Sequence, residues 1–390
     1  MKKYTKYAWN KFKALNKIYG YAFSNEILKE LGHKIESLLP DNNITCRVSN
    51  DIFASIFIYE EDIKKLLSKI YEEASMLKID GINIKLNLSI GAYNIIPNEM
   101  DINNVLDKAY LARSQVKGVY NNSYYLFDEK LENKLMEEQM LESDMEKGLK
   151  EKEFVIVYQP KTFTANEKMS GAEALVRWYK DGEFIPPNKF IPLFEKNKFI
   201  LKLDMYIFDK VCQDLAEWRE RFGIMPNISI NVSKEHFVDE NFIEKYVEIC
   251  NKYEIETNQI DLEVTESATV DGNIDILKIL TKIKEKGFTI SIDDFGTGYS
   301  SLSMLQSMPI DIIKVDKVFV DKADLNSDKN IINHIIFIAE SLGIKTVVEG
   351  VETKEQAEYI RRIKGDIIQG YYYSKPISKE EFEEYFNKNM

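Results

Sequence analysis

Histidine and cysteine are scarce in this sequence. Three of its 390 residues are His, each alone in the chain, which argues against a histidine-based catalytic triad or a zinc site. The three cysteines, Cys46, Cys212 and Cys250, are far apart and form no CxxC pair. The sequence therefore predicts packing roles for them, in place of a disulfide framework or a thiolate metal site.

Long apolar runs and an excess of positive charge are also absent. No uninterrupted apolar stretch approaches the roughly 18 residues that a membrane-spanning helix needs, and residues 1–13 lack the apolar core of a secretory signal. We therefore expect a cytoplasmic protein without a membrane span. The formal charge of -12 argues against bulk nucleic-acid binding, which relies on many phosphate contacts from Lys and Arg. An anionic ligand would need local positive charge or bound metal.

The second half of the chain has the pattern of repeated βα units. Short runs rich in Ile and Val alternate with longer amphipathic stretches, and eight such runs suit a closed (β/α)8 barrel. The first two runs are joined by a polar, turn-like segment and could instead pair as a hairpin. An open doubly wound sheet is the alternative fold. The runs are residues 154–159, 172–178, 228–231, 260–266, 288–294, 311–316, 345–350 and 366–370.

The first half predicts a smaller α/β domain. Helical patterns cover residues 25–39 and 61–77, and strand-like runs cover residues 52–59 and 84–93. Residues 131–150 have apolar positions at helical spacing among many charges, as expected of a connecting helix. The predicted organisation is a domain at 1–127, a connecting helix at 128–150 and a second domain at 151–390.

Polar residues gather at the C-terminal ends of the barrel runs, where barrel enzymes build their active sites. A single carboxylate there could cap a helix, but several around one closed mouth would repel one another unless cations lie between them. A set of Asp, Glu and Asn oxygens favours Mg²⁺ or Mn²⁺ over zinc or copper. The residues are Glu173, which lies inside its run, and then Asn231, Glu263, Glu266, Asp293, Asp294, Lys314, Asp316, Glu349 and Gln369.

Several motifs of the second half occur in the order typical of one family. They include EAL at 173–175, ISINVS at 228–233, DDFGTGYSSLSML at 293–305 and VVEGVET at 347–353. With these motifs, residues 140–388 resemble the EAL-domain family of cyclic di-GMP phosphodiesterases. The resemblance implies a TIM-like barrel whose first strand runs antiparallel to the others, in agreement with the hairpin alternative.

The resemblance also implies a role for each site residue. It makes Glu173, Asn231, Glu263 and Asp293 ligands of one metal, with Asp293 and Asp294 serving a second. It places Lys314 near the attacking water as general base or electrostatic partner, oriented by Asp316, with Glu349 near the metal centre and Gln369 positioning the water. Glu266 would hold the DDFGTG loop, in which Gly296 and Gly298 permit the backbone turns. Gln159, Leu175 and Arg177 would contact the substrate.

Two of these assignments have simpler alternatives. Lys314 could be an ordinary barrel lysine paired with Asp316, and Arg177 could be a structural ion-pair partner. Glu352, which follows Glu349 in the VVEGVET motif, could contact the site or cap a helix that begins near Thr353, and capping is the preferred interpretation.

The implied function is hydrolysis of cyclic di-GMP to linear pGpG by a homodimeric enzyme with two Mg²⁺ or Mn²⁺ ions in each site. Two metals would activate the water and neutralise the charge that develops on phosphorus. A receptor that binds cyclic di-GMP without cleaving it is the main alternative. An enolase-like barrel, with Lys314 as base, leaves Gln159 and Arg177 without a role.

The N-terminal half resembles, more weakly, a degenerate GGDEF domain. Residues 49–53 read SNDIF, so Ser49 and Asn50 replace the two glycines that approach nucleotide phosphate, and Ile52 replaces the acidic residue. Asn10 and Lys17 stand where the family has aspartates, and the usual opening helix is missing, as in a truncated domain. The resemblance therefore implies a scaffold, a regulator or a dimerisation element without cyclase activity.

Overall fold

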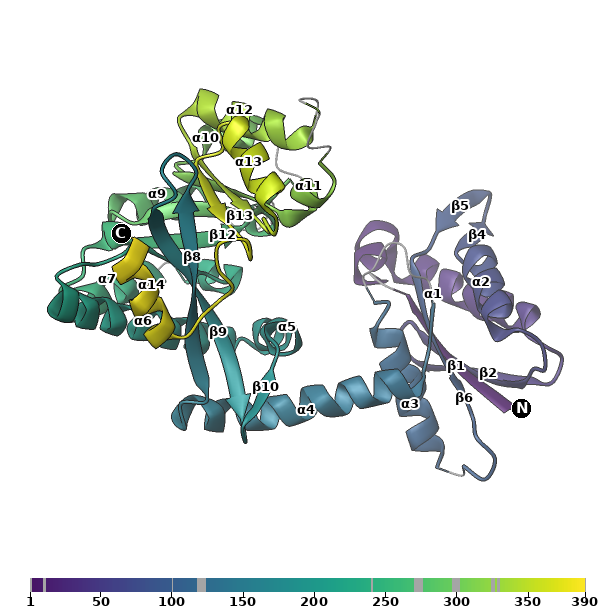
Figure 1. Cartoon of the computed structure of the whole chain (residues 1–390). Helices are drawn as coiled ribbons and strands as arrows, with labels where there is room; N and C mark the ends of the chain where they lie inside the picture. Colours follow the sequence, from purple (N-terminus) through teal and green to yellow (C-terminus); the bar gives the residue numbers. More distant parts are fainter. Residues whose placement is uncertain are drawn as a thin grey trace. The chain divides into compact units, whose positions relative to one another are not determined.

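The chain divides into two compact units, Met1–Gln139 and Met140–Met390. The computed structural model (Figure 1) describes residues 2–9, 12–99, 101–117, 124–239, 241–269, 276–296, 302–323, 327 and 330–389. Helix α4 (Glu129–Lys150) runs from the first unit into the second. Within the described ranges, none of the helices combines the length and the apolarity needed to cross a lipid bilayer.

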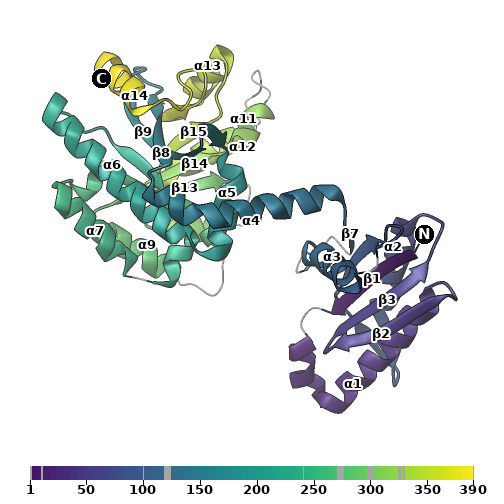
Figure 2. The ribbon, with the colours of Figure 1, turned by 90° about the horizontal axis from the view of Figure 1, so that it is seen from below.

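The N-terminal unit is a sheet with helices on both faces (Figure 2). Alternation along the strands produces the two faces: Phe53 and Phe57 pack with α1 and α2, whereas Ala54 packs with α3. Gly91 permits the close approach of α3, since a Cβ there would lie 2.0 Å from the Ala109 carbonyl oxygen. The strand order is β2-β3-β1-β6-β7, with β1 Lys2–Trp9, β2 Asn43–Ser49, β3 Ile52–Ile58, β6 Leu88–Asn94 and β7 Tyr124–Leu126. The helices are α1 Phe12–Leu38, α2 Ile63–Ala74 and α3 Ile102–Ser114.

Two expectations for this unit need correction. The first helix spans Phe12–Leu38, far longer than the 25–39 predicted, and it bends at Gly20, whose φ of 79° is not helical. The expected strand at 84–93 is split, because Ile84 and Lys85 belong to the separate hairpin β4 (Met76–Ile79) and β5 (Ile82–Lys85). The break was not predicted because Leu86 and Leu88, both buried, continue the apolar pattern of the sequence across it.

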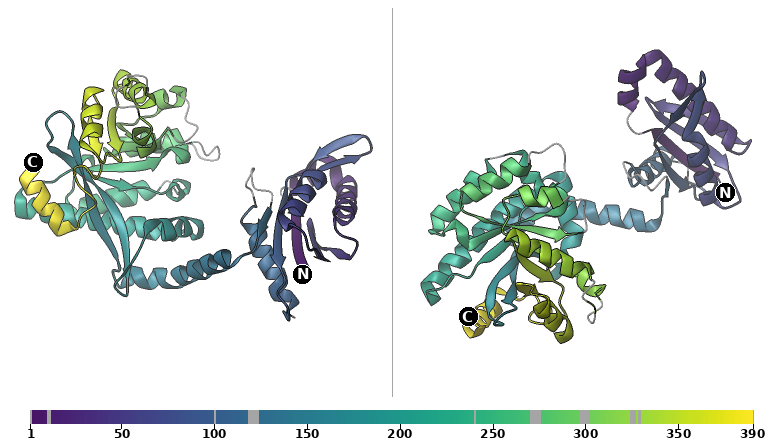
Figure 3. Two further views of the ribbon diagram at one scale, coloured as in Figure 1. Left: turned by 45° about the vertical axis from the view of Figure 1, so that its right-hand side comes forward. Right: turned by 90° about the horizontal axis from the view of Figure 1, so that it is seen from above.

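The second unit is a closed barrel. Among the described residues, eight strands form it in the order β9-β11-β12-β13-β14-β15-β16-β8, and β8 pairs with β9 to close the ring (Figure 3). Strand β8 runs antiparallel to both of its neighbours, as expected of the first strand. The open doubly wound alternative is therefore wrong. The strands are β8 Phe154–Phe163, β9 Met169–Lys180, β11 Ile228–Asn231, β12 Ile260–Thr265, β13 Thr289–Phe295, β14 Ile312–Val315, β15 Lys345–Glu349 and β16 Ile367–Gln369.

Amphipathic helices cover the outside of the barrel. In α12, Ile332, Ile336 and Ala339 are buried at helical spacing, and the helix ends at Gly343 with a φ of 70°, as expected of a glycine C-cap. The short strand β10 (Glu183–Ile185) extends β9 beyond the ring. The α-helices described in this unit after α4 are α5 Pro187–Asn197, α6 Ile200–Phe222, α7 Phe242–Tyr253, α8 Glu266–Thr269, α9 Ile276–Glu285, α10 Leu302–Ser307, α11 Lys317–Asp321, α12 Ile331–Leu342, α13 Lys354–Arg362 and α14 Lys379–Asn389.

Candidate active site

Four carboxylates from four barrel strands converge on the ammonium group of Lys314. Lys314 lies on β14 with its side chain only 1% exposed. Its Nζ is 2.6 Å from Glu263 Oε2 on β12 and 2.9 Å from Glu349 Oε1 on β15. It is also 3.1 Å from Asp293 Oδ1 on β13 and 3.3 Å from Glu173 Oε2 on β9. Residues far apart in the sequence thus meet at one point of the barrel mouth, because parallel strands end on the same side.

Negative charge exceeds positive charge in this cluster. Burial alone would lower the pKa of Lys314, but Glu173, Glu263, Glu349 and Asp293 together raise it well above its usual value. Burial raises the pKa of Glu349 to about 7 even though Lys314 opposes the shift. For Glu263, burial is outweighed by the charges of Lys314 and Lys161, which bring the pKa to about 2. Lys314 is therefore an ammonium here, and together with Lys161, which contacts Glu263, it gives the cluster two positive charges for four acids.

Side-chain amides hold both oxygens of Glu173. Asn231 Nδ2 donates to Glu173 Oε1 at 2.7 Å, and Gln369 Nε2 donates to Glu173 Oε2 at 2.6 Å. Gln369 Nε2 also reaches Gln159 Oε1 at 3.1 Å. The buried Gln369 Oε1 has no hydrogen-bond partner in the part of the chain that the structure describes. A buried acceptor without a partner is costly, so this oxygen is suited to a ligand or a water molecule.

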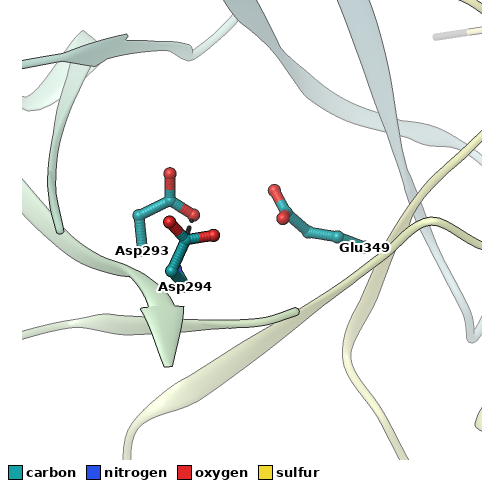
Figure 4. Close-up of side chains that lie close together, drawn as sticks. All are labelled: Asp293, Asp294 and Glu349. Atoms are coloured by element: carbon teal, nitrogen blue, oxygen red, sulfur yellow. Dashed lines mark hydrogen bonds between the residues drawn. The ribbon is translucent and has the colours of Figure 1, made fainter. Parts of the chain in front are cut away.

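Three acids at the edge of this cluster also lie together. One carboxylate oxygen each from Asp293, Asp294 and Glu349 fall within 4.8 Å of one another (Figure 4). Adjacent residues on a regular strand point to opposite faces, but Asp294 has a φ of 55° and the β13–β14 register shifts between Ile292 and Phe295. This irregularity brings two consecutive aspartates to the same mouth.

The contacts of Asp316 differ from both roles considered for it in the sequence, orienting Lys314 and forming an ion pair with Lys314. Its carboxylate caps α11, accepting the N–H of Val318 at 2.7 Å. Burial, Asp293 and Asp316, in that order, raise the pKa of Asp294. The ion pairs of Lys314 with described residues do not include Asp316, so the simple Lys314–Asp316 pair is wrong.

Glu266 holds the chain that follows Asp294. Its Oε2 accepts the N–H of Gly296 at 2.8 Å. Gly296 has a φ of 95°, and a Cβ there would lie 2.6 Å from Phe319 Cζ, so both the conformation and the space require glycine. Gly298, expected to act similarly, lies outside the described residues.

Two hollows flank Leu175 near the acidic cluster. One, of about 360 Å³, is lined by Gln159, Glu173, Leu175, Lys317, Glu349, Gly350, Glu352, Gln369, Gly370 and Tyr371. The other, of about 230 Å³, includes Leu175, Arg177 and Asn231 among its lining residues. Arg177 is half-buried, and its Nη1 donates to the Val176 carbonyl oxygen at 2.9 Å. Two of the residues expected to contact substrate, Gln159 and Arg177, therefore belong to different hollows that share Leu175.

Two residues near the site were misjudged or missed by sequence reasoning. Thr353, and not Glu352, caps α13, because Thr353 and Gln356 form a reciprocal capping box. Glu352 instead forms an ion pair with Lys317. The sequence interpretation also overlooked Lys161, whose Nζ lies 3.1 Å from Glu263 Oε1. The available signal was its position two residues after Gln159, which places both side chains on the same face of a strand.

The N-terminal unit forms a hairpin at the SNDIF segment. Ser49 of β2 pairs with Ile52 of β3, so Asn50 and Asp51 form a two-residue turn. Asn50 takes a φ of 39° without being glycine, and its carbonyl oxygen accepts a hydrogen bond from Arg47 Nε at 2.6 Å. Asn10 lies outside the described residues, and Lys17 lies on α1.

The donor set of the barrel cluster fits a hard divalent cation. Glu173, Glu263, Asp293, Asp294 and Glu349 offer carboxylate oxygens, and Asn231 adds an amide oxygen. Mg²⁺ and Mn²⁺ prefer oxygen ligands, and their charge would offset the excess of acid. Fold and site together define a barrel protein with an acidic, metal-compatible centre at its C-terminal mouth.

Comparison with known sequences identifies the family more closely. The chain belongs to the EAL domain family, whose profile matches residues 142–376, more than half of the sequence. The profile described as diguanylate cyclase, GGDEF domain, matches residues 7–123.

Two curated relatives align with nearly the whole chain, across both of its parts. The chain is 31% identical over 371 residues to the oxygen sensor protein DosP of Escherichia coli, covering 93% of this chain and 46% of DosP. It is 29% identical over 375 residues to the bifunctional diguanylate cyclase/cyclic di-GMP phosphodiesterase MucR of Pseudomonas aeruginosa, covering 95% and 55% respectively. The chain spans about half the length of the curated relatives it matches.

A solved structure supports the same fold. The PaMucR phosphodiesterase in complex with c-di-GMP superposes with a TM-score of 0.59 at 33% sequence identity. The match covers 62% of this chain and 99% of the solved chain.

Proposed function

We propose that this chain hydrolyses cyclic di-GMP to linear pGpG at the barrel mouth, with divalent metal bound among its acids. The observation that carries the proposal is the convergence of Glu173, Glu263, Asp293 and Glu349 on one buried point. Membership of the EAL family and the likeness to a phosphodiesterase solved with c-di-GMP support the choice of substrate.

Most of the predicted site residues have a place in this proposal. Glu173, Asn231, Glu263 and Asp293 would hold one ion, and Asp293 with Asp294 would hold a second. Bound metal would lower the pKa of the attacking water and neutralise charge on the phosphate. The buried ammonium of Lys314 stabilises negative charge at the mouth, and the free Gln369 Oε1 orients the water. Gln159, Leu175 and Arg177 line the two hollows and bind the dinucleotide, with the planar donors of Arg177 suited to phosphate.

The main test is a turnover assay with product analysis. The protein is incubated with cyclic di-GMP and Mg²⁺ or Mn²⁺, and the products are separated by chromatography. Calorimetry with Ca²⁺ in parallel measures binding of the cyclic dinucleotide. Conversion to pGpG supports the proposal. A folded protein that binds the dinucleotide and returns it intact would contradict the proposal and favour the receptor alternative.

The N-terminal unit is proposed to be regulatory and to lack cyclase activity. We propose that the chain consists of a degenerate GGDEF-like domain at 1–127, a connecting helix at 128–150 and the EAL domain at 151–390. With Ser49 at the end of β2 and Asn50 in the turn, side chains occupy the positions where the family has glycines, so close approach of a nucleotide phosphate is hindered.

We expect no cyclic di-GMP to form from GTP and Mg²⁺ or Mn²⁺. The assay should use the Glu173→Ala variant, so that hydrolysis does not remove any product that forms. An active diguanylate cyclase in the same buffer is the positive control. Accumulation of the cyclic product above a no-enzyme blank would show that the domain is a working cyclase.

A homodimer through the EAL domain and a location in the cytoplasm remain predictions from the sequence. Light scattering with size-exclusion chromatography should give a mass of about twice 45.5 kDa at assay concentration. A fully active species with the mass of one chain would contradict the dimer.

A further inference from the structure

A second layer of buried polar side chains lies beneath the acidic cluster. Asp261 and Glu263 are two residues apart on β12, so their side chains lie on the same face of the strand. Their contacts with the buried Lys161 place this face inside the barrel. Asp261 Oδ2 accepts from Ser229 Oγ at 2.6 Å, and Asp261 Oδ1 accepts from Ser291 Oγ at 2.7 Å. Lys161 supplies the positive charge of this layer.

Lys161 lies between the two layers and contacts both. Its side chain is 6% exposed, and its Nζ is 3.1 Å from Glu263 Oε1 and 3.8 Å from Asp261 Oδ2. The same Nζ donates to Ser229 Oγ. Where Lys161 pairs with Gly171, β9 carries an extra residue, and bulges of this kind redirect neighbouring side chains.

Glu263 is therefore held by a different ammonium at each oxygen. Lys161 contacts Oε1 from below, and Lys314 contacts Oε2 within the acidic cluster. A carboxylate fixed at one oxygen can rotate only at the cost of that contact, so its second oxygen keeps a constant direction. Outer partners of this kind orient metal ligands and tune their affinity.

We propose that Lys161 is a positioning residue that fixes the Glu263 carboxylate from beneath, so that Oε2 is presented to the divalent cation at the barrel mouth. This inference rests on the proposed function, because it assumes that Glu263 is a metal ligand. Lys161 itself does not reach the reacting atoms.

If Lys161 acts by positioning Glu263, its removal should change the affinity for a divalent cation in the opposite direction from that expected if Lys161 acts only through its charge. By Coulomb's law, loss of a nearby positive charge should strengthen the binding of a divalent cation. Loss of positioning should weaken it, because Glu263 would be free to rotate and would have to be ordered when the metal binds.

The test is calorimetric titration of the full chain with Mn²⁺, comparing wild type with Lys161→Met. We expect the variant to bind Mn²⁺ about tenfold more weakly, the lower end of the range for lost outer partners of a metal ligand. The matched control is Lys345→Met. Lys345 is exposed, and it lines the same polar hollow as Lys161, at the end of the barrel opposite the acidic mouth. The control should bind Mn²⁺ as wild type does.

The outcomes separate this inference from the proposed function. If wild type binds no Mn²⁺, the metal site itself is wrong. If wild type binds Mn²⁺ and a folded Lys161→Met binds it equally well or more tightly, the positioning role alone is wrong. Circular dichroism reports folding.

A second variant decides the matter if Lys161→Met does not fold. Ser229→Ala removes the hydroxyl that contacts Lys161 Nζ and leaves the lysine in place. We then expect about fivefold weaker Mn²⁺ binding, the usual value of one hydrogen bond. Unchanged binding would overturn the inference.

Discussion

Replacing Glu173 with alanine should lower the rate of cyclic di-GMP hydrolysis by about a thousandfold or more. The side chain is nearly inaccessible to solvent and is held at both oxygens, by Asn231 on one and by Gln369 and Lys314 on the other. Loss of this carboxylate removes a proposed metal ligand and releases three neighbours from their common partner. Initial rates of pGpG formation at saturating Mg²⁺ would measure the effect.

The fold should survive this substitution. Removing one acid from a cluster with excess negative charge relieves repulsion, so the metal-free protein should unfold at a temperature close to that of wild type. Glu183→Ala, at an exposed position on β10, is the matched control and should keep the wild-type rate. Equal rates in Glu173→Ala and wild type would show that the metal assignment is wrong.

Replacing Lys314 with methionine should destabilise the metal-free protein by about 3–5 kcal/mol, the cost of leaving buried charges without their partner. Four carboxylates contact this one ammonium, and they would repel one another without it. Divalent metal should replace part of the missing charge. Mn²⁺ is therefore expected to raise the unfolding temperature of the variant more than that of wild type.

Thermal unfolding in EDTA and in Mn²⁺ would measure both effects. The control is Lys322→Met, because Lys322 is exposed at the end of α11 and its loss should leave both unfolding temperatures unchanged. Equal stability of Lys314→Met and wild type in EDTA would mean that the four contacts contribute nothing to the fold.

The barrel could be predicted because its strands are apolar and regularly spaced. All eight predicted runs became strands, since each is buried by the ring and by the surrounding helices. The N-terminal unit was harder. A continuous apolar pattern at 84–93 concealed a break between two strands, and the bend at Gly20 allowed a helix to extend well before the predicted start.

The convergence of the acids could also be expected, because all but Glu173, which lies inside β9, are at or near the C-terminal ends of parallel strands. Their detailed contacts could not. The left-handed backbone at Asp294 places two consecutive aspartates on one side, which strand alternation would not predict. Two further contacts could not be predicted from the sequence: Lys314 lies among four acids, and Asp316 caps α11. These contacts depend on side-chain packing across several strands.

The most direct test of the metal-centred account is anomalous diffraction from crystals grown with Mn²⁺. The account predicts one manganese peak bound by Glu173, Asn231, Glu263 and Asp293, and a second bound by Asp293 and Asp294. A map from well-ordered crystals with no peak at this mouth, and with Lys314 still in contact with all four carboxylates, would contradict it.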